Sequence, residues 1–476
     1  MSEQEKLPEK EKNFSEWYHE LIRRTLIDQR YPFQGFLVYR PLGAEMFSRA
    51  INILEELLRE RGHQKVYFPS LIPEKLLKKE EHHIMGVAHE VFWVTNAGKT
   101  NLEEPAALRP TSETAMYEML RYWIRSWRDL PLKIFQSCSV FRYETKHTRP
   151  LIRDREILWN EAHTSHASME EAEEQIKEGI EIYTKLYEKL AIPHIWIDVI
   201  TGVFAGAESA KEAYTIFPDG RMLEMGSVNN LGQRFSRAFD IKFKTRDEKE
   251  DYVYQTCYGV SERILSAIVA VHGDNFGLVI PPEIAPIQIV LIPIFYKEDR
   301  EEVLKETYKL KEKISKETEY RIVLDDNEEQ TPGEKFYKWE LYGVPLRIEL
   351  GKKDIEKGGI TIVRRDIKKK EFVENKKIIE KIKFLFEDIT KNMQKRAKEY
   401  HESKIVFAKK IENIPKVINE NKVAKIVWCG DIECASKIEK QVNSVFVGKA
   451  IDEKADGSCI WCGKTGKFYG YVGKTY

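Results

Sequence analysis

The sequence has 476 residues, which is too long for one hydrophobic core and predicts roughly two to four domains. Charged residues make up 32% of the chain and cancel to a formal net charge of +0, which excludes an overall basic field that would attract nucleic acid. Residues 278–296 form the most apolar stretch, and prolines interrupt it, so it does not predict a membrane span. Because residues 1–12 are charged rather than apolar, we expect a cytoplasmic protein without a secretion signal or a membrane partner.

The first part of the chain predicts amphipathic helices joined to short strands. Apolar spacing predicts a helix over 14–26 and a second over 44–61, which Gly62 ends. Residues 66–69 then predict a strand that ends in proline. The apolar face of the second helix suits packing inside the subunit and packing against a second subunit equally well.

A motif of hydroxyl and charged residues, 109–114, precedes a predicted helix over 115–127. Thr111 and Ser112 are candidate N-caps, and Glu113 suits the positive end of that helix. For Ser112 we prefer the capping role. For Thr111 and Glu113 a second interpretation is that a hydroxyl and a carboxylate face a small cationic ligand.

Residues 133–140 and 157–159 predict two buried strands joined by a loop rich in basic residues. The loop contains Arg142, Glu144 and Arg153. Because the rigid fork of arginine matches phosphate and carboxylate oxygens, the loop suits a polyphosphate beside a polar base. The alternative is a solvated charged hairpin. His163 and His166 follow the second strand, and hydrogen-bonded pocket histidines are a better interpretation than a metal pair.

The pattern of strands changes near residue 281. Short strands with few helices across 130–265 predict an antiparallel sheet. One helix in this region is predicted to begin at a capping box of Ser168 and Glu171 and to end near residue 190, and a second is predicted over 264–272. After a proline-rich linker at 281–286, alternating strands and helices up to residue 350 predict a small α/β domain with a mostly parallel sheet. A long charged helix from about residue 372 leads into a third region.

The six cysteines divide into two groups. Cys138 and Cys257 lie alone in apolar surroundings and are expected to be core thiols. The other four form two close pairs, and four thiolates fit a structural, tetrahedral Zn²⁺ site without an open position. The candidate zinc ligands are Cys429, Cys434, Cys459 and Cys462.

Several motifs in order along residues 14–476 resemble those of class II aminoacyl-tRNA synthetases, specifically the prolyl-tRNA synthetase family of the archaeal and eukaryotic type. Each motif alone is weakly specific, but their order is highly specific. The matching stretches are 109–114, 141–150, 158–164, 204–207, 259–263, 272–274 and 339–351. The resemblance implies an α+β catalytic domain on an antiparallel sheet (1–284), an α/β anticodon-binding domain (285–385) and a small zinc-binding α+β domain (386–476), in a homodimer.

The resemblance also implies a ligase that activates L-proline with ATP and Mg²⁺ and transfers it to tRNA(Pro). Arg142 and Arg263 would be the catalytic groups. The implied ATP-binding residues are Arg142, Glu144, Arg153, Glu224, Ser227, Ser261 and Arg263. The implied proline-binding residues are Thr111, Glu113, Arg142, Trp159, Glu161, His163, Phe204 and Asn229. The implied anticodon-binding residues are Phe336, Glu340, Arg347, Lys353 and Asp354.

The sequence departs from the family pattern at a few positions. Glu224 stands where the family has a glutamine that helps to place Mg²⁺ and phosphate, and Asn229 stands where it has a histidine. Residues 208–211 also depart from the usual tyrosine and threonine run. Two alternatives therefore stay open: a diverged paralogue that activates another small or proline-like amino acid, and a tRNA-binding relative without catalysis. The presence of Arg142, Glu144 and Arg263 argues against the second alternative.

Overall fold

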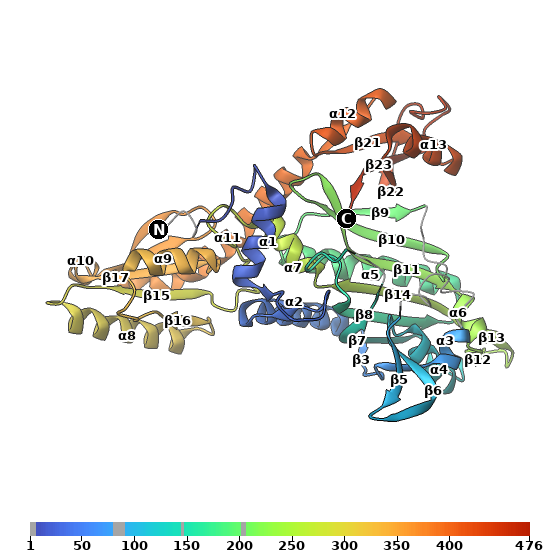
Figure 1. Ribbon diagram of the computed structural model, residues 1–476, viewed down its shortest axis with the longest axis horizontal. Helices are drawn as coiled ribbons and strands as arrows, with labels where there is room; N and C mark the ends of the chain where they lie inside the picture. The colour runs from blue at the N-terminus through green and yellow to red at the C-terminus, as the bar shows by residue number, and fades with distance from the viewer. Residues whose placement is uncertain (1–5, 80–90, 144–146, 201–205) are drawn as a thin grey trace.

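The computed structural model describes residues 6–79, 91–143, 147–200 and 206–476 (Figure 1). A small α/β unit lies at the left of Figure 1 and a large sheet with its helices at the right. The long helix α11 (Ile378–Ser403) runs from the first to the second. Glu144 and Phe204, two of the expected site residues, lie outside the described ranges.

The largest sheet has 11 strands in the order β20-β21-β23-β22-β9-β10-β11-β14-β8-β7-β3. From β9 to β7 each strand is antiparallel to the next, so the predicted antiparallel sheet is confirmed. These strands are β9 (Ile195–Val199), β10 (Ser209–Ile216), β11 (Arg221–Gly232), β14 (Tyr254–Ser261), β8 (Glu156–His166) and β7 (Leu132–Phe141). The edge strand β3 (Gln64–Lys65) pairs in parallel with β7 and is shorter and earlier than the strand expected over 66–69.

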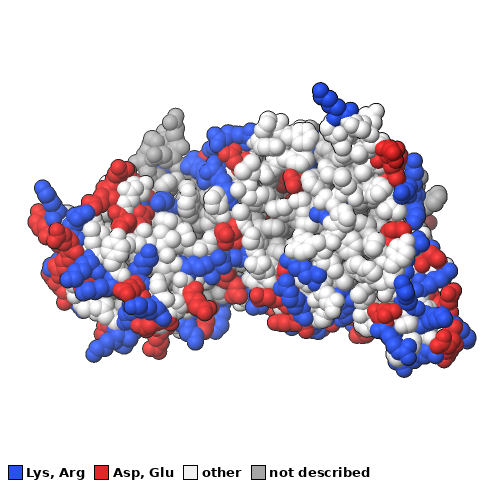
Figure 2. All heavy atoms as spheres, turned by 90° about the horizontal axis from the view of Figure 1, so that it is seen from below, with Lys and Arg blue, Asp and Glu red and all other residues white. Residues whose placement is uncertain are grey.

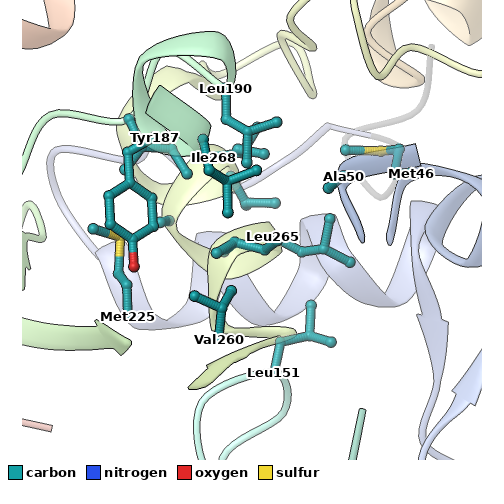
Figure 3. Close-up of a cluster of buried hydrophobic side chains, with 14 of the residues drawn as sticks. Met46, Ala50, Leu151, Tyr187, Leu190, Met225, Val260, Leu265 and Ile268 are labelled. Carbon is teal, nitrogen blue, oxygen red and sulfur yellow. The ribbon is translucent and has the colours of Figure 1, made fainter. Parts of the chain in front are cut away.

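Helices pack against this sheet and bury a large apolar cluster. The predicted helices are present with small shifts at their ends: α1 (Phe14–Thr25), α2 (Pro41–Glu60), α4 (Glu113–Trp123), α5 (Met169–Lys189) and α7 (Arg263–His272). Figure 3 shows α2, α5 and α7 meeting β11 and β14 around side chains such as Ala50, Leu190, Met225 and Leu265. The α5 helix starts where expected because the side chain of Ser168 accepts a hydrogen bond from the amide of Glu171.

Short elements complete this part of the molecule. The sheet β4-β6-β5 lies at the lower right of Figure 1, beside α3 and α4. The remaining elements are β1 (Ile27–Asp28), β2 (Val38–Tyr39), β4 (Leu71–Pro73), α3 (Glu74–Lys79), β5 (Trp93–Ala97), β6 (Thr100–Leu108), α6 (Arg234–Ala238), β12 (Lys242–Lys244) and β13 (Glu250–Tyr252).

The α/β unit has a five-stranded sheet in the order β16-β15-β17-β18-β19. The three strands expected up to residue 350 are parallel, as predicted, whereas β18 and β19, which the sequence did not predict, join the sheet antiparallel. A parallel pair requires a crossover of a dozen or more residues, and only the short helix α10 (Lys352–Glu356) connects β17 to β18. The elements are β15 (Ile289–Ile294), α8 (Arg300–Glu317), β16 (Ile322–Leu324), α9 (Pro332–Leu341), β17 (Leu346–Gly351), β18 (Gly359–Arg364) and β19 (Lys370–Glu374).

The C-terminal region adds its strands to the large sheet. β22 pairs with β9, and β23 pairs both with β22 and, in parallel, with β11. The end of the chain is thereby held beside β11, a central strand of the large sheet. The elements are β20 (Ile405–Phe407), α12 (Ile414–Asn419), β21 (Val423–Trp428), α13 (Ile432–Val442), β22 (Val445–Lys454) and β23 (Phe468–Thr475). Among the described helices, none combines the length and apolarity that a bilayer crossing requires.

Candidate active site

A cavity of about 480 Å³ lies on the sheet, between the loop after β7 and the strands β8, β10, β11 and β14. Arg142 and Arg263 both line it, although they are 121 positions apart in the sequence (263 − 142). The site residues expected from the sequence that line the cavity are Thr111, Glu113, Arg142, Arg153, Trp159, Glu161, His163, Glu224, Ser227, Asn229, Ser261 and Arg263.

Strand register brings polar side chains together at one end of this cavity. Glu161 on β8 lies opposite Gln136 on β7, and His163 lies opposite Cys257 on β14. Asn229 on β11 also pairs with Cys257. Because residues directly opposite each other on antiparallel strands have close side chains, these five groups form one polar cluster.

Glu161 and His163 form a buried ion pair in the cluster. His163 Nε2 lies 3.2 Å from Glu161 Oε2, and both side chains are at most 3% exposed. Burial alone would lower the pKa of His163, but the hydrogen bond to Glu161 and the charges of Glu113 and Glu161 raise it. Burial likewise opposes ionisation of Glu161, yet its pKa is lowered by His163 and by hydrogen bonds from Ser112 and Gln136. The cluster therefore favours an imidazolium beside a carboxylate.

Glu113 is a second buried carboxylate in the cluster. Burial raises its pKa, and repulsion from Glu161 adds to the effect, while the charge of His163 opposes it. The hydroxyl of Thr111 donates to its carboxylate. An organic cation bound here would therefore favour the ionised form of Glu113.

Ser112 and Gln136 hold Glu161 in place. Gln136 Nε2 donates to Glu161 Oε1 at 2.9 Å and to Ser112 Oγ at 2.7 Å. The backbone amide of Ser112 points at Glu161 Oε2 from 3.3 Å. Because the hydroxyl of Ser112 accepts from Gln136 and does not cap α4, the prediction of a capping role for Ser112 is wrong.

Trp159 separates this cluster from the basic part of the cavity. The guanidinium of Arg142 lies 5.4 Å from the centre of the Trp159 ring, within the range of a cation–π contact. Nε of Arg142 donates to the carbonyl oxygen of Pro110 at 2.9 Å. This anchor fixes the direction of the guanidinium relative to the aromatic wall.

Arg263 starts α7 and carries the second guanidinium. Its Nε donates to the carbonyl oxygen of Ile152 at 3.0 Å, and its Nη1 forms an ion pair with Glu224 Oε2 at 3.0 Å. Glu212 on β10 lines the same wall, and burial together with the charge of Glu224 raises its pKa to about 8. The two carboxylates and one guanidinium can bind a divalent cation and a phosphate side by side.

Arg153 lies at the edge of the cavity and contacts the end of the chain. Its Nη2 donates to the backbone oxygen of Tyr476 at 2.7 Å. The Tyr476 hydroxyl donates to Asp219 at 2.9 Å, and the guanidinium of Arg149 lies 5.1 Å from the centre of its ring. β23 therefore places Tyr476 at the edge of the cavity where Arg153 lies.

The four candidate zinc ligands also converge. Cys429 follows β21, Cys434 lies on α13, and Cys459 and Cys462 lie between β22 and β23. Their sulfur atoms all lie within 4.8 Å of one another, and the Cys429 and Cys462 sulfurs are 3.7 Å apart. A tetrahedron with Zn–S bonds of about 2.3 Å has sulfur atoms about 3.8 Å apart, so the four thiols fit zinc.

A second group of potential ligands, Glu113, His163 and Cys257, lies inside the cavity. Nδ1 of His163 is 3.0 Å from the Tyr117 hydroxyl, and its Nε2 is bonded to Glu161. Because both ring nitrogens already have partners, this group suits an organic cation better than a metal ion.

The expected anticodon residues divide between two places in the α/β unit. Phe336, Glu340 and Arg347 meet: the Arg347 guanidinium lies 4.1 Å from the Phe336 ring centre and 3.2 Å from the Glu340 carboxylate. Lys353 and Asp354 lie on α10. The Asp354 carboxylate accepts hydrogen bonds from the Gly351 amide and the Thr361 hydroxyl, which is a structural role.

Sequence reasoning missed four groups that belong to the cavity or its border. Gln136 and Glu212 lie on strands, where side chains alternate between the two faces of the sheet, and both face the site. This could be predicted from the sequence only if the strand register were known. Cys257 is buried in the core, as expected, and it also lines the cavity, which the sequence did not indicate. The position of Tyr476 follows from a sheet pairing with β11 that no local pattern reveals.

The antiparallel sheet, the arginine-lined cavity and the separate α/β unit define a class II aminoacyl-tRNA synthetase. The family model of the tRNA synthetase class II core domain (G, H, P, S and T) matches residues 92–272, and the anticodon binding domain model matches 288–385. The model of the prolyl-tRNA synthetase C-terminal domain matches 411–476. The expected class II fold is thereby confirmed.

Similar proteins cover the chain from end to end. A proline–tRNA ligase of Thermofilum pendens is 46% identical over 100% of both chains, and one of Ignicoccus hospitalis is 44% identical over 98% of this chain and 99% of its own. A solved structure of Giardia lamblia prolyl-tRNA synthetase in complex with prolyl-adenylate superposes with a TM-score of 0.96 at 34% identity, covering 99% of this chain and 100% of the other. The chain belongs to the prolyl-tRNA synthetase family.

Proposed function

We propose that this protein is a proline–tRNA ligase that activates L-proline with ATP and transfers it to the 3′ end of tRNA(Pro). The observation that carries the proposal is the shared cavity, in which Arg142 and Arg263 face one space and the Glu161–His163 pair closes its far end. Family membership supports the same activity, and no feature of the cavity favours the two alternatives left open by the sequence.

In the first step a carboxylate oxygen of proline attacks the α-phosphorus of ATP. A bond forms between that oxygen and phosphorus, the bond from phosphorus to the bridging oxygen breaks, and pyrophosphate leaves with the electron pair. Two anions must approach each other, so charge neutralisation and alignment matter more than a protein nucleophile. Arg142 would bridge the proline carboxylate and the α-phosphate. Arg263 and Arg153 would bind the outer phosphates, and Ser227 and Ser261 would offer hydroxyl groups to the nucleotide.

In the second step the terminal ribose hydroxyl of tRNA attacks the carbonyl carbon of the adenylate. The bond from that carbon to the phosphate oxygen breaks, AMP leaves with the electron pair, and the proton of the attacking hydroxyl passes to the phosphate of the departing AMP. Glu144, which lies outside the described residues, is proposed to accept a hydrogen bond from the adenine amino group in both steps, because a carboxylate only accepts.

The secondary amine of proline is cationic and suits the polar end of the cavity. Glu113 and Glu161 would face the amine, and Thr111 would hold the Glu113 carboxylate. Trp159 would form one apolar wall for the ring, and Phe204, outside the described residues, a second wall. The side chain of Asn229 donates to Ser227 at 3.1 Å and lies 3.7 Å from the Cys257 sulfur, so it would close the ring end where the family has histidine.

The carboxylates Glu224 and Glu212 fit a Mg²⁺ ion, which prefers oxygen ligands. When bound, Mg²⁺ would supply positive charge to the phosphate oxygens. Glu224 also pairs with Arg263, so a phosphate bound by Arg263 would compete with this carboxylate for the guanidinium.

The α/β unit is proposed to bind the anticodon. Phe336 beside Arg347 and Glu340 offers a ring for stacking and charged groups for base edges, which is how unpaired bases are recognised. Lys353 would contribute a cation on α10. Asp354 would contribute to anticodon binding indirectly, because its hydrogen bonds with Gly351 and Thr361 hold this segment in place.

We further propose a homodimer in the cytosol with one structural zinc per chain. Large apolar side chains are exposed on or next to β3, β4, β5 and α4, and a second subunit would cover them; they are Tyr67, Leu71, Trp93, Met119, Tyr122 and Trp123. Figure 2 shows this side of the molecule, where uncharged atoms occupy a broad area between more highly charged ends. Sedimentation should give twice the monomer mass, and a monomer at micromolar concentration would contradict the dimer.

The proposed function is tested by charging of a tRNA(Pro) transcript with radiolabelled amino acids in the presence of ATP and Mg²⁺. Formation of prolyl-tRNA supports it. If a different amino acid is attached to tRNA, the diverged paralogue is the correct alternative.

A further inference from the structure

The part of the molecule built on the large sheet and the α/β unit meet at a bidentate ion pair between Asp274 and Arg365. Arg365 directly follows β18, and Asp274 lies two residues after α7. The two guanidinium Nη atoms donate to the two carboxylate oxygens of Asp274 at 2.8 and 2.6 Å. The Arg365 side chain is 3% exposed and the Asp274 side chain 38%, so the guanidinium of this bidentate pair is buried at the junction while the carboxylate stays partly open to water.

Each partner is anchored in its own half of the molecule. The backbone oxygen of Asp274 accepts from Trp17 Nε1 at 3.0 Å, and its Oδ1 also accepts from the amides of Phe276 and Gly277. On the other side, Nε of Arg365 donates to the carbonyl oxygen of Glu340 at 3.0 Å. The ion pair therefore joins two already ordered segments.

The backbones around the pair fit closely. Leu278 donates its amide to the carbonyl oxygen of Leu341 at 3.0 Å. A Cβ atom on Gly277 would lie 2.3 Å from Cα of Leu341, and one on Gly343 would lie 2.7 Å from the carbonyl carbon of Leu278. Because there is no space for even a methyl group, a small rotation of one half requires the junction to open.

The pair also lies between two functional groups of side chains. One short helix, α7, separates Asp274 from Arg263 at the phosphate side of the cavity. On the other side Arg365 holds the end of α9, from which Glu340 reaches Arg347 in the proposed anticodon site. The junction therefore helps to fix the distance between these two sites.

We propose that Asp274 and Arg365 are positioning residues that hold the α/β unit at the orientation in which one tRNA reaches the anticodon site and the cavity together. This inference rests on the proposed function. Adenylate formation needs only the cavity, so it does not depend on the pair. Transfer to tRNA depends on it, because a tRNA bound to a misoriented α/β unit cannot place its 3′ end at the adenylate.

The test uses the full chain with Asp274→Asn, Arg365→Gln and both together. Asparagine keeps the oxygen that accepts from Phe276 and Gly277 but removes the charge. Arg300→Gln is the matched control, since it breaks an exposed Arg300–Glu328 pair in the same unit, with side chains 43% and 49% exposed. Amino-acid-dependent pyrophosphate exchange and charging of a tRNA(Pro) transcript are measured for each variant.

We expect Asp274→Asn to leave kcat and KM for proline and ATP in exchange unchanged and to lower kcat/KM for tRNA at least about fivefold. The double variant should be no worse than the poorer single variant, because both lose the same interaction. Unchanged tRNA charging, a parallel fall in exchange, or additive losses would overturn the proposal. If Arg365→Gln fails to fold, the comparison of exchange and tRNA charging in Asp274→Asn alone decides whether the proposal holds. Absence of exchange in the wild type would instead overturn the proposed function.

Discussion

Nε2 of His163 lies 3.2 Å from Oε2 of Glu161, and both side chains are almost completely buried at the far end of the cavity. The pKa of His163 is raised and that of Glu161 is lowered, each mainly by the other against the opposing effect of burial. The pair is thus ionised in the folded protein, and its contribution to stability depends on pH.

The sign of this dependence follows from the two shifts. The contribution of His163 is fully present below the unfolded pKa of 6.5 and is lost as pH rises through the folded value. The contribution of Glu161 is present above 4.5 and is lost as pH falls. Glu161→Gln should therefore destabilise the protein most between pH 4.5 and 6.5 and less at alkaline pH. Urea denaturation at pH 6 and pH 9 measures the difference in unfolding free energy between the wild type and the variant. An equal difference at both pH values would contradict the ion pair.

Arg142→Ala should lower the rate of pyrophosphate exchange by about 10²–10³-fold, by analogy with the loss of one donor that stabilises a developing charge. The Arg142 side chain lines the cavity and lies outside the hydrophobic core, so the circular dichroism spectrum and the thermal midpoint should stay close to those of the wild type. Arg23→Ala, on the exposed side of α1, is the matched control. Exchange that survives Arg142→Ala would show that another group bridges carboxylate and α-phosphate.

Glu212 predicts a pH dependence of Mg²⁺ activation. Its pKa of about 8 means that a cation must displace a proton below that pH, so the Mg²⁺ concentration for half-maximal exchange should fall as pH rises from 6.5 to 8.5. Glu212→Gln should remove this dependence, whereas Glu174→Gln on the exposed face of α5 should keep it. A wild-type Mg²⁺ requirement that does not change with pH would exclude Glu212 from the cation site.

Metal analysis should find about one zinc per chain, and chelation should lower the thermal midpoint, because four thiolates hold α13, β21 and the loop before β23 together. A backbone hydrogen bond at Lys464 lowers the pKa of Cys462 to about 7, which favours the thiolate before the metal binds. Cys459→Ser should reduce the zinc content. Purified protein with all four cysteines intact and no zinc would contradict the site.

Local sequence signals predicted the elements around the cavity well. The β-branched run of β7 and the cap at Ser168 act over a few residues, and both elements lie where expected. Motifs likewise predicted that Arg142 and Arg263 share a cavity, because a family pattern carries information about the whole fold.

Features that depend on pairing between distant segments escaped prediction. Cys257 meets His163 through a register between strands whose residues are 94 positions apart (257 − 163), and nothing local specifies it. Strands β18 and β19 were not predicted from the sequence, because the short segment before them is compatible with a loop as well as with a hairpin. The Asp274–Arg365 pair likewise looks like two ordinary surface charges in the sequence.

The most direct test of the central claim is pyrophosphate exchange into ATP, measured with a panel of all amino acids. One cavity in which Arg142 and Arg263 face a single adenylate and the Glu161–His163 pair closes the amino acid end predicts exchange with proline alone. Exchange with a different amino acid, or with none, would contradict the account.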